Sequence, residues 1–198
     1  ASTSNWSGSL GSANPTVNVT VATPGGTASG DVMIATMHAR RSGGGSGTFT
    51  PTASGWTLLV ELVNSSTDYR AVWYRVLSGS PAADYAFAFA WTTIDVTTVL
   101  ALASITTYRD VDNSSPVHVI GTPSNEQSPE NTTATAPSIT TTAQGSLLVG
   151  MFSTEWNASR TWTPPAGMTE RLDIQATLDG LTVTHEVADE LMPAAGAT

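Results

Sequence analysis

Apolar and polar residues alternate along much of the chain with a period of two, the pattern of half-buried β-strands. Val17, Val19 and Val21 alternate with polar residues, which predicts a strand over 16–21. Residues 85–91 (YAFAFAW) alternate aromatic side chains with alanine. This second pattern predicts a strand whose aromatic side lies in a core rather than on an exposed binding platform.

Short apolar runs bounded by turn residues predict the remaining strands. We expect them over 31–39, 56–63, 69–77, 99–108, 138–142, 147–152, 170–174 and 181–187. No window of a dozen residues carries the apolar stripe of a helix. About ten strands without a long helix predict an all-β fold, a two-sheet antiparallel β-sandwich with jelly-roll-like connections.

The chain also repeats itself. GDVMIATM at 30–37 and GSLLVGMF at 145–152 open two similar segments, each followed by Thr-Pro and then Gly-x-Thr. A shift of 112 positions pairs Gly55 with Gly167, and Pro81 with Pro193. Because repeats report architecture directly, we expect 30–83 and 145–195 to be related halves with the same strand order.

Residues 1–15 (ASTSNWSGSLGSANP) are polar and rich in Gly and Ser, which predicts an arm or linker ahead of one sandwich domain at 16–198. Trp6 is an exception in such an arm, and we expect it to dock on an assembly or binding surface. After Pro193 no counterpart of the aromatic strand follows. The second half therefore needs a strand, either 16–21 of the same chain or one from a neighbouring subunit.

Charge narrows the choice of partners. The 198 residues include no cysteine, sixteen acidic residues and seven basic ones, all arginine, for a net charge of -9. This balance argues against nucleic acid or an anionic membrane surface as partner, because phosphate binding needs clustered cations. Only 12% of the residues are charged, and Ser and Thr supply much of the polarity. This composition is typical of a rigid extracellular or particle-surface protein.

Catalytic signals are weak. His38, His118 and His185 have no metal-ligand spacing, and the chain has neither cysteine nor a Gly-x-Ser-x-Gly elbow. Glu61 and Asp173 occupy equivalent positions of the repeat, and paired carboxylates are the machinery of glycoside hydrolysis. Their place in alternating strands instead predicts exposed charges that discourage edge aggregation. We therefore expect no enzyme.

One loop offers ligands for calcium. Asp110, Asp112 and Asn113 lie in DVDNSS, where oxygen donors occupy alternate positions. The loop lacks the glycine and the distal glutamate of an EF-hand, and the alternative is an Asx-capped turn leading to Pro116. We expect no cofactor other than calcium at this turn.

The order of motifs resembles a known kind of module. GDVMIATM, TPTASGWTLL, AVWYRVLSGSPAADYAFAF, ITTYRDVDNSSPV, APSITTTAQGSLLVGMF and TPPAGMTER follow one another from residue 30 onward. This series resembles non-catalytic β-sandwich modules of secreted proteins of high-GC Gram-positive bacteria and of tail and other virion proteins of their phages. These motifs are strand starts, turns and packing positions, so no catalytic residue carries over.

The resemblance implies a structural, assembly or adhesive module of a phage particle (a tail or capsid-surface protein) or extracellular fibre. Its partners would be further copies of itself or other virion or fibre subunits. The alternative is a carbohydrate-binding module of a secreted bacterial protein. That alternative requires exposed tryptophans, such as Trp156 and Trp162, beside a groove for a glycan.

Overall fold

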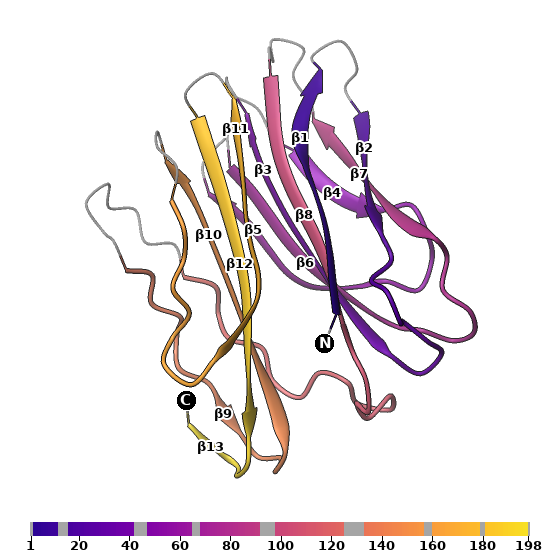
Figure 1. The fold of residues 1–198 in the computed structure, drawn as a ribbon, viewed down its shortest axis with the longest axis vertical. Coiled ribbons are helices and arrows are strands. Elements are labelled where there is room, and N and C mark those ends of the chain that lie inside the picture. Colours follow the sequence, from indigo (N-terminus) through magenta and orange to yellow (C-terminus); the bar gives the residue numbers. More distant parts are fainter. Residues whose placement is uncertain are drawn as a thin grey trace.

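The computed structural model describes residues 2–11, 16–41, 47–64, 68–91, 98–124, 133–156, 160–178 and 181–197, and their regular elements are all β-strands (Figure 1). These are β1 (Ser2–Gly11), β2 (Thr16–Ala22), β3 (Val32–Arg41), β4 (Gly47–Pro51), β5 (Thr57–Asn64), β6 (Asp68–Val76), β7 (Asp84–Trp91), β8 (Thr98–Tyr108), β9 (Thr140–Thr141), β10 (Ser146–Trp156), β11 (Thr169–Leu178), β12 (Leu181–Met192) and β13 (Gly196–Ala197). The predicted all-β fold is confirmed.

Two antiparallel sheets form the main sandwich. One has the order β1-β8-β3-β6-β5, and the other has the order β2-β7-β4. The aromatic side of β7 lies between them: Tyr85, Phe87 and Phe89 are buried, as the alternating pattern predicts. Trp56 packs edge-on against Tyr85 and Phe87, with ring centroids 5.5 and 5.2 Å apart. The core of the sandwich therefore sits where the sequence places it.

A third sheet, β10-β12-β11, covers part of the opposite face of the five-stranded sheet. In Figure 1 the three sheets stand as layers, with the five-stranded sheet in the middle. A small apolar cluster of Leu100, Leu102 and Val183 joins β8 to β12. The sequence pattern predicted a sandwich of two sheets but not this additional layer, because strand periodicity does not tell which sheet a strand joins.

The pairing within the main sandwich is nested. β1 pairs with β8, β2 with β7 and β3 with β6, all antiparallel, so that strands pair like the two arms of one long hairpin. Jelly rolls are built by such wrapping. Here β5 joins the five-stranded sheet beside β6 rather than the sheet that contains β4. The jelly-roll connection therefore stays a prediction.

The two halves of the repeat have the same strand order. β3-β6-β5 in the first half corresponds to β10-β12-β11 in the second. A register shift interrupts β5 between Leu58 and Val60, and another interrupts β11 between Glu170 and Leu172, 112 positions later. The glycines that precede these strands, Gly55 and Gly167, have φ angles of 88° and 96°, which glycine adopts without strain. The halves thus share pairing, bulge and turn.

In the N-terminal region one expectation is wrong, and one of two alternatives is excluded. Residues 2–11, expected as an arm or linker, form β1 and pair along their whole length with β8. Ladder hydrogen bonds come from the backbone, so a Ser- and Gly-rich segment can complete a sheet whose apolar strands are already in place. Strand 16–21 does not complete the second half either, because β2 pairs with β7.

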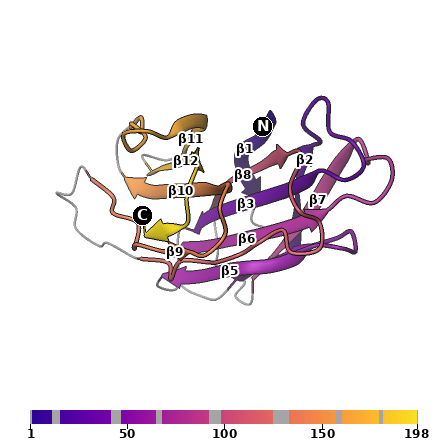
Figure 2. The same cartoon turned by 90° about the horizontal axis from the view of Figure 1, so that it is seen from below.

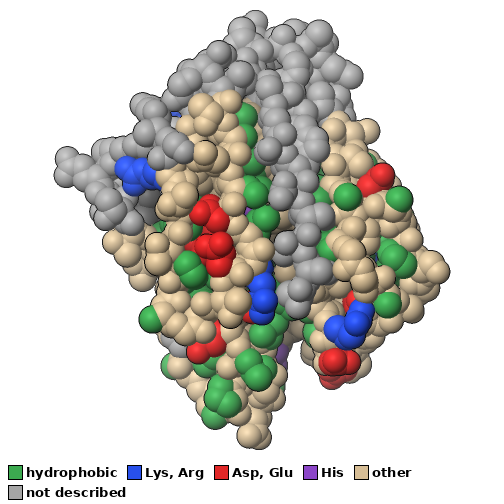
Figure 3. All heavy atoms as spheres, in the orientation of Figure 1, with side chains coloured by type: hydrophobic (Ala, Val, Ile, Leu, Met, Phe, Trp, Pro, Cys, Tyr) green, Lys and Arg blue, Asp and Glu red, His purple; other side chains and the backbone are tan. Residues whose placement is uncertain are grey.

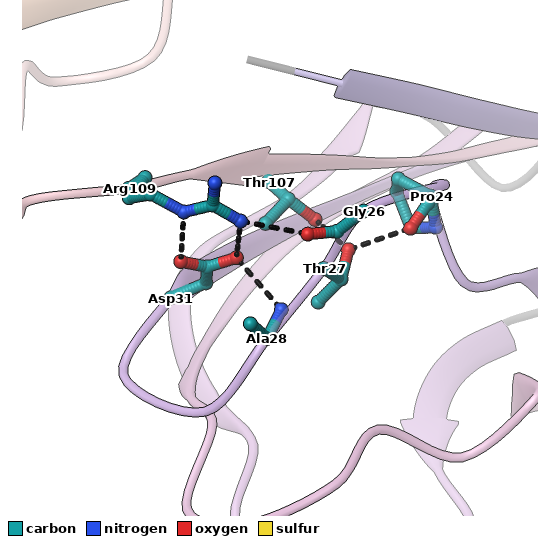
Figure 4. A network of polar contacts seen from close by, with 7 residues as sticks. All are labelled: Pro24, Gly26, Thr27, Ala28, Asp31, Thr107 and Arg109. Atoms are coloured by element: carbon teal, nitrogen blue, oxygen red, sulfur yellow. Dashed lines mark hydrogen bonds and ion pairs between the residues drawn. The ribbon is translucent and has the colours of Figure 1, made fainter.

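A polar network ties the loop between β2 and β3 to the end of β8 (Figure 4). Asp31, nearly fully buried, accepts hydrogen bonds from Arg109 Nε at 3.2 Å and from the Ala28 N–H at 2.9 Å. Arg109 also donates to the Gly26 carbonyl at 2.7 Å. Burial acts to raise the pKa of Asp31, but the hydrogen bonds from Arg109 and Ala28 outweigh it and lower the pKa below its ordinary value.

Replacing Arg109 with alanine is expected to lower the urea midpoint of unfolding at neutral pH, because Asp31 then keeps only the Ala28 N–H. A carboxylate with a lowered pKa stabilises the fold above its unfolded pKa and loses this contribution as the pH falls through its folded pKa. The difference between wild type and variant should therefore narrow from pH 7 to pH 3. A difference of equal size at both pH values would contradict the assignment.

Candidate interaction site

An apolar strip on the five-stranded sheet is left partly uncovered by the third sheet. Ile34 of β3, Val72 of β6, and Val60 and Leu62 of β5 are each half-buried, and Val60 lies directly opposite Val72. Ile34 is notable because every other residue over 31–39 is buried. On the other face of β3 and β6, Met33, Ala35, Met37, Tyr69 and Ala71 are fully buried in the core that β7 shares. The strip therefore has the composition of a core without complete cover.

The edge of β10 lies beside this strip. β10 pairs with β12 on one side, and no described strand pairs with it on the other. Its odd-numbered side chains face the five-stranded sheet, since Glu155 bonds Arg40 of β3 at 2.9 Å. Val149 and Met151 on this side are half-buried, and Leu147 is exposed next to its cross-strand partner Leu191. An open strand edge and an uncovered apolar surface thus occur together.

The apolar strip and the free edge of β10 line a cleft of about 2110 Å³, which we call the β10 cleft. The segment between β8 and β9, which Figure 2 shows running beside β5 and β6, contributes Val119 and Ile120 to its lining. Of six large hydrophobic side chains exposed in the described part of the chain, four line this cleft. Sites for small molecules usually measure about 300–1,000 Å³. The β10 cleft is larger than such sites.

Polar side chains from β3, β8 and β12 meet at the inner end of the cleft. His185 Nε2 lies 2.6 Å from Thr36 Oγ1, which in turn lies 2.6 Å from Ser104 Oγ. All three residues are buried. Burial lowers the pKa of His185 to about 3, so this ring is neutral at physiological pH. A group that gains a proton only in strong acid is a poor general base. The cluster instead connects two sheets through side-chain hydrogen bonds and forms a buried polar joint between them.

Charged residues near the inner end of the cleft form ion pairs with one another. Asp68 accepts from His38 Nε2 at 2.8 Å and from Arg70 at 2.7 Å, and Arg40 pairs with Glu155. Burial lowers the pKa of His38, so the neutral ring donates its N–H to the carboxylate. Burial also raises the pKa of Glu155, against the influence of Arg40. The cleft therefore presents paired charges rather than a field of one sign.

The outer face of the third sheet holds a second cluster, of carboxylates. Glu186 of β12 is 1% exposed, and neither of its carboxylate oxygens has a hydrogen-bond partner. Asp173 lies directly opposite it on β11. Burial, together with Glu170 and Asp173, raises the pKa of Glu186 to about 7. Figure 3 shows acidic side chains gathered on this side of the molecule.

Trp162, expected on a binding surface, is half-buried over this outer face. Its indole N–H donates to Thr184 Oγ1 at 2.9 Å, and its backbone N–H donates to Asp173 at 3.0 Å. Its ring lies 6.0 Å from that of Phe152. A tryptophan whose polar atom is already bonded within the protein covers the sheet rather than forming an open platform. Asp173, expected as an exposed charge, is half-buried and holds this segment in place.

The calcium candidates form a turn closed by its own side chains. Asp112 Oδ1 accepts from the Ser114 N–H at 2.9 Å and from the Ser114 hydroxyl at 2.7 Å. These bonds lower the pKa of Asp112. The neighbouring Asp110 has a φ of 62°, and Asn113 lies beside Gly30. Among the described residues no three His, Cys, Asp or Glu side chains converge as metal ligands. Calcium binding at Asp110, Asp112 and Asn113 stays a prediction.

The side chains of Trp6 and Trp156 lie outside the described residues, although their backbones belong to β1 and β10. The role of these tryptophans in a binding surface therefore stays a prediction. His118 is exposed and bonds Thr142 at 2.8 Å. It contacts neither of the two buried histidines through any hydrogen bond in the described structure.

Sequence reasoning missed the β10 cleft and the buried polar joint. Val60, Leu62 and Val72 look like any core residues of a strand, and only the tertiary arrangement leaves them half-covered. His38 and Asp68 are thirty positions apart but meet through the pairing of β3 with β6. The strand that the sequence predicted to be missing is the counterpart of β7, which belongs to another sheet, so this prediction did not point to the cleft.

Comparisons with known proteins return no match: no family model, no curated protein and no solved structure is similar to this chain. No helix among the described residues is long and apolar enough to cross a membrane. Functional inference therefore starts from the geometry of the cleft and from the sequence.

Proposed function

We propose that this protein is a structural module that acts through contacts with other protein subunits, as an assembly or adhesive component of a phage particle or an extracellular fibre. The β10 cleft carries this proposal. A free strand edge beside half-covered aliphatic side chains is a liability in an isolated monomer, and natural proteins usually blunt or cover such an edge. A partner subunit would cover both features.

The chemistry of the cleft supports a structural role over a catalytic one. The histidine buried at its inner end is neutral, and the described charged residues that line it are of both signs. The hydroxyl groups closest to His185, those of Thr36 and Ser104, are buried together with it and are not open to a substrate. The low fraction of charged residues, 12%, and the abundant Ser and Thr fit close packing of subunits at a particle surface.

A glycan-binding role has less support. The aromatic residues that line the cleft, Tyr108, Phe152 and Trp162, are buried or half-buried, whereas sugar-binding grooves use exposed aromatic faces. Trp162, one of the two tryptophans expected to flank such a groove, is bonded to Thr184 and packed over the third sheet. If the protein binds a glycan array and the Trp162→Ala variant does not, glycan binding becomes the preferred function over assembly.

Sedimentation velocity on the purified protein and on the Leu147→Lys variant tests the proposal. Leu147 is 39% exposed at the cleft, so a lysine there places a charge in the contact without filling a core. We expect the wild type to self-associate with rising concentration, or to associate with its native particle or fibre, and the variant to do so at least tenfold more weakly.

Leu58→Lys is the matched control, because Leu58 is similarly exposed at 41% but lies outside the cleft lining. It should associate as the wild type does. A wild type that stays monomeric at high concentration, and that also fails to bind its particle or fibre, would overturn the proposal.

A further inference from the structure

At the β10 cleft, one edge of β10 is paired with no described strand. In the first half β3 lies between β6 and β8. In the second half β10 takes the place of β3 and β12 that of β6, but no described strand takes the place of β8. The empty position is the free edge of β10. The first half therefore shows what kind of element belongs there.

We infer that the β10 cleft receives an extended, uncharged, aliphatic peptide segment from a neighbouring subunit, which adds to the free edge of β10 as a further strand. This inference rests on the proposed assembly function and specifies its contact. Strand addition supplies main-chain hydrogen bonds for affinity and pockets for alternate side chains for specificity.

The cleft offers contacts for both the backbone and the side chains of such a strand. Its backbone would satisfy the outward N–H and C=O groups of β10, which no described strand pairs. Because side chains of a strand alternate between two faces, one set would point at the half-buried strip of Ile34, Val60, Leu62 and Val72. Contacts along the strand would also cover Leu147, which is now exposed.

Charge complementarity specifies the occupant. The described charged residues that line the cleft are of both signs, and two of them are ion-paired, Glu155 with Arg40 and Arg70 with Asp68, so the cleft has no field of one sign to attract an ionic partner. Burying an unpaired charge against the aliphatic strip would be costly. β8, which fills the equivalent position beside β3, contains no charged residue over TVLALASITTY. An occupant of similar composition fits the cleft best.

A fluorescent peptide with the sequence of β8 (98–108) and a solubilising tail outside it is a direct probe. Titration with the full chain, followed by fluorescence anisotropy, is expected to give saturable binding. Hydrogen exchange should slow at alternate backbone amides of β10. The Leu147→Lys variant should bind at least tenfold more weakly, and Leu58→Lys should bind like the wild type.

Two N-methylated peptides separate strand pairing from nonspecific apolar contact. Each carries methyl groups on one of the two alternating sets of backbone nitrogens, and only one set faces β10 in a paired strand. We expect one peptide to lose binding at least tenfold and the other to retain it. Equal binding of both would overturn strand addition, and so would equal loss.

The outcomes also separate this inference from the proposed function. If the protein associates in sedimentation but neither binds the peptide nor gains protection on β10, strand addition is wrong while the assembly function stands. If the protein associates only with itself and this association protects β10, the donor is a second copy of the chain. If the protein neither associates nor binds the peptide, both proposals fail.

Discussion

Replacing Asp68 with alanine is expected to lower the free energy of unfolding by about 3–5 kcal/mol, the usual effect of removing one partner from a buried ion pair. Asp68 is 1% exposed and accepts hydrogen bonds from both His38 and Arg70. Without it, the buried His38 N–H has no acceptor and the Arg70 guanidinium loses its counter-charge. Urea denaturation at pH 7 measures the loss.

The double variant His38→Leu/Asp68→Leu is the informative control. Replacing both buried partners with apolar groups removes the unpaired donor as well as the acceptor, so it should cost less than Asp68→Ala alone. A double variant that is less stable than the single one would show that the pair contributes net stability by itself. Arg70 can then turn toward the solvent, as it is already partly exposed.

Replacing Glu186 with glutamine is expected to stabilise the protein by about 2 kcal/mol at pH 8 and to change little at pH 5. Burial beside Glu170 and Asp173 raises the pKa of Glu186 to about 7. For an acid whose folded pKa is raised, the protonated form stabilises the fold below the unfolded pKa. This contribution is lost as the pH rises through about 7. Glutamine stays neutral throughout.

Thermal unfolding of wild type and variant across pH 5–8 tests this, with Glu61→Gln as the control, since Glu61 is an exposed glutamate on another strand, β5. The control should show no pH-dependent gain. A Glu186→Gln variant that is less stable than the wild type at pH 8 would mean that the ionised carboxylate has a cationic partner, and would contradict the assignment.

The fold was predictable where a local pattern coincides with burial. The alternation of Tyr85, Phe87 and Phe89 with alanine predicts which face of the strand lies in the core. The repeat, in which Gly55 pairs with Gly167, predicts two halves with the same strand order. Both signals are read within short windows of sequence. Tertiary structure then only has to bring together faces that are already specified.

The rest depended on contacts that no local pattern encodes. β1 was missed because its place is set by backbone pairing with β8, and Ser and Gly offer the same backbone N–H and C=O groups as any residue except proline. Glu186 looks like the outward residue of an alternating strand, yet it is buried because Trp162 and neighbouring segments cover the outer face of its sheet. The β10 cleft arises from incomplete cover, which is a property of the assembled layers.

The nested pairing of the main sandwich has a consequence for synthesis on the ribosome. Ser2 pairs with Thr107 and Gly11 with Thr98, so the first strand has no partner until the eighth has left the exit tunnel. The inner pair of β5 and β6 is available much earlier. The sandwich therefore closes from its centre outward, and β1 remains unpaired nascent chain for most of the translation of this half. The β10-β12-β11 sheet, built from neighbouring segments, is made only after that closure is possible.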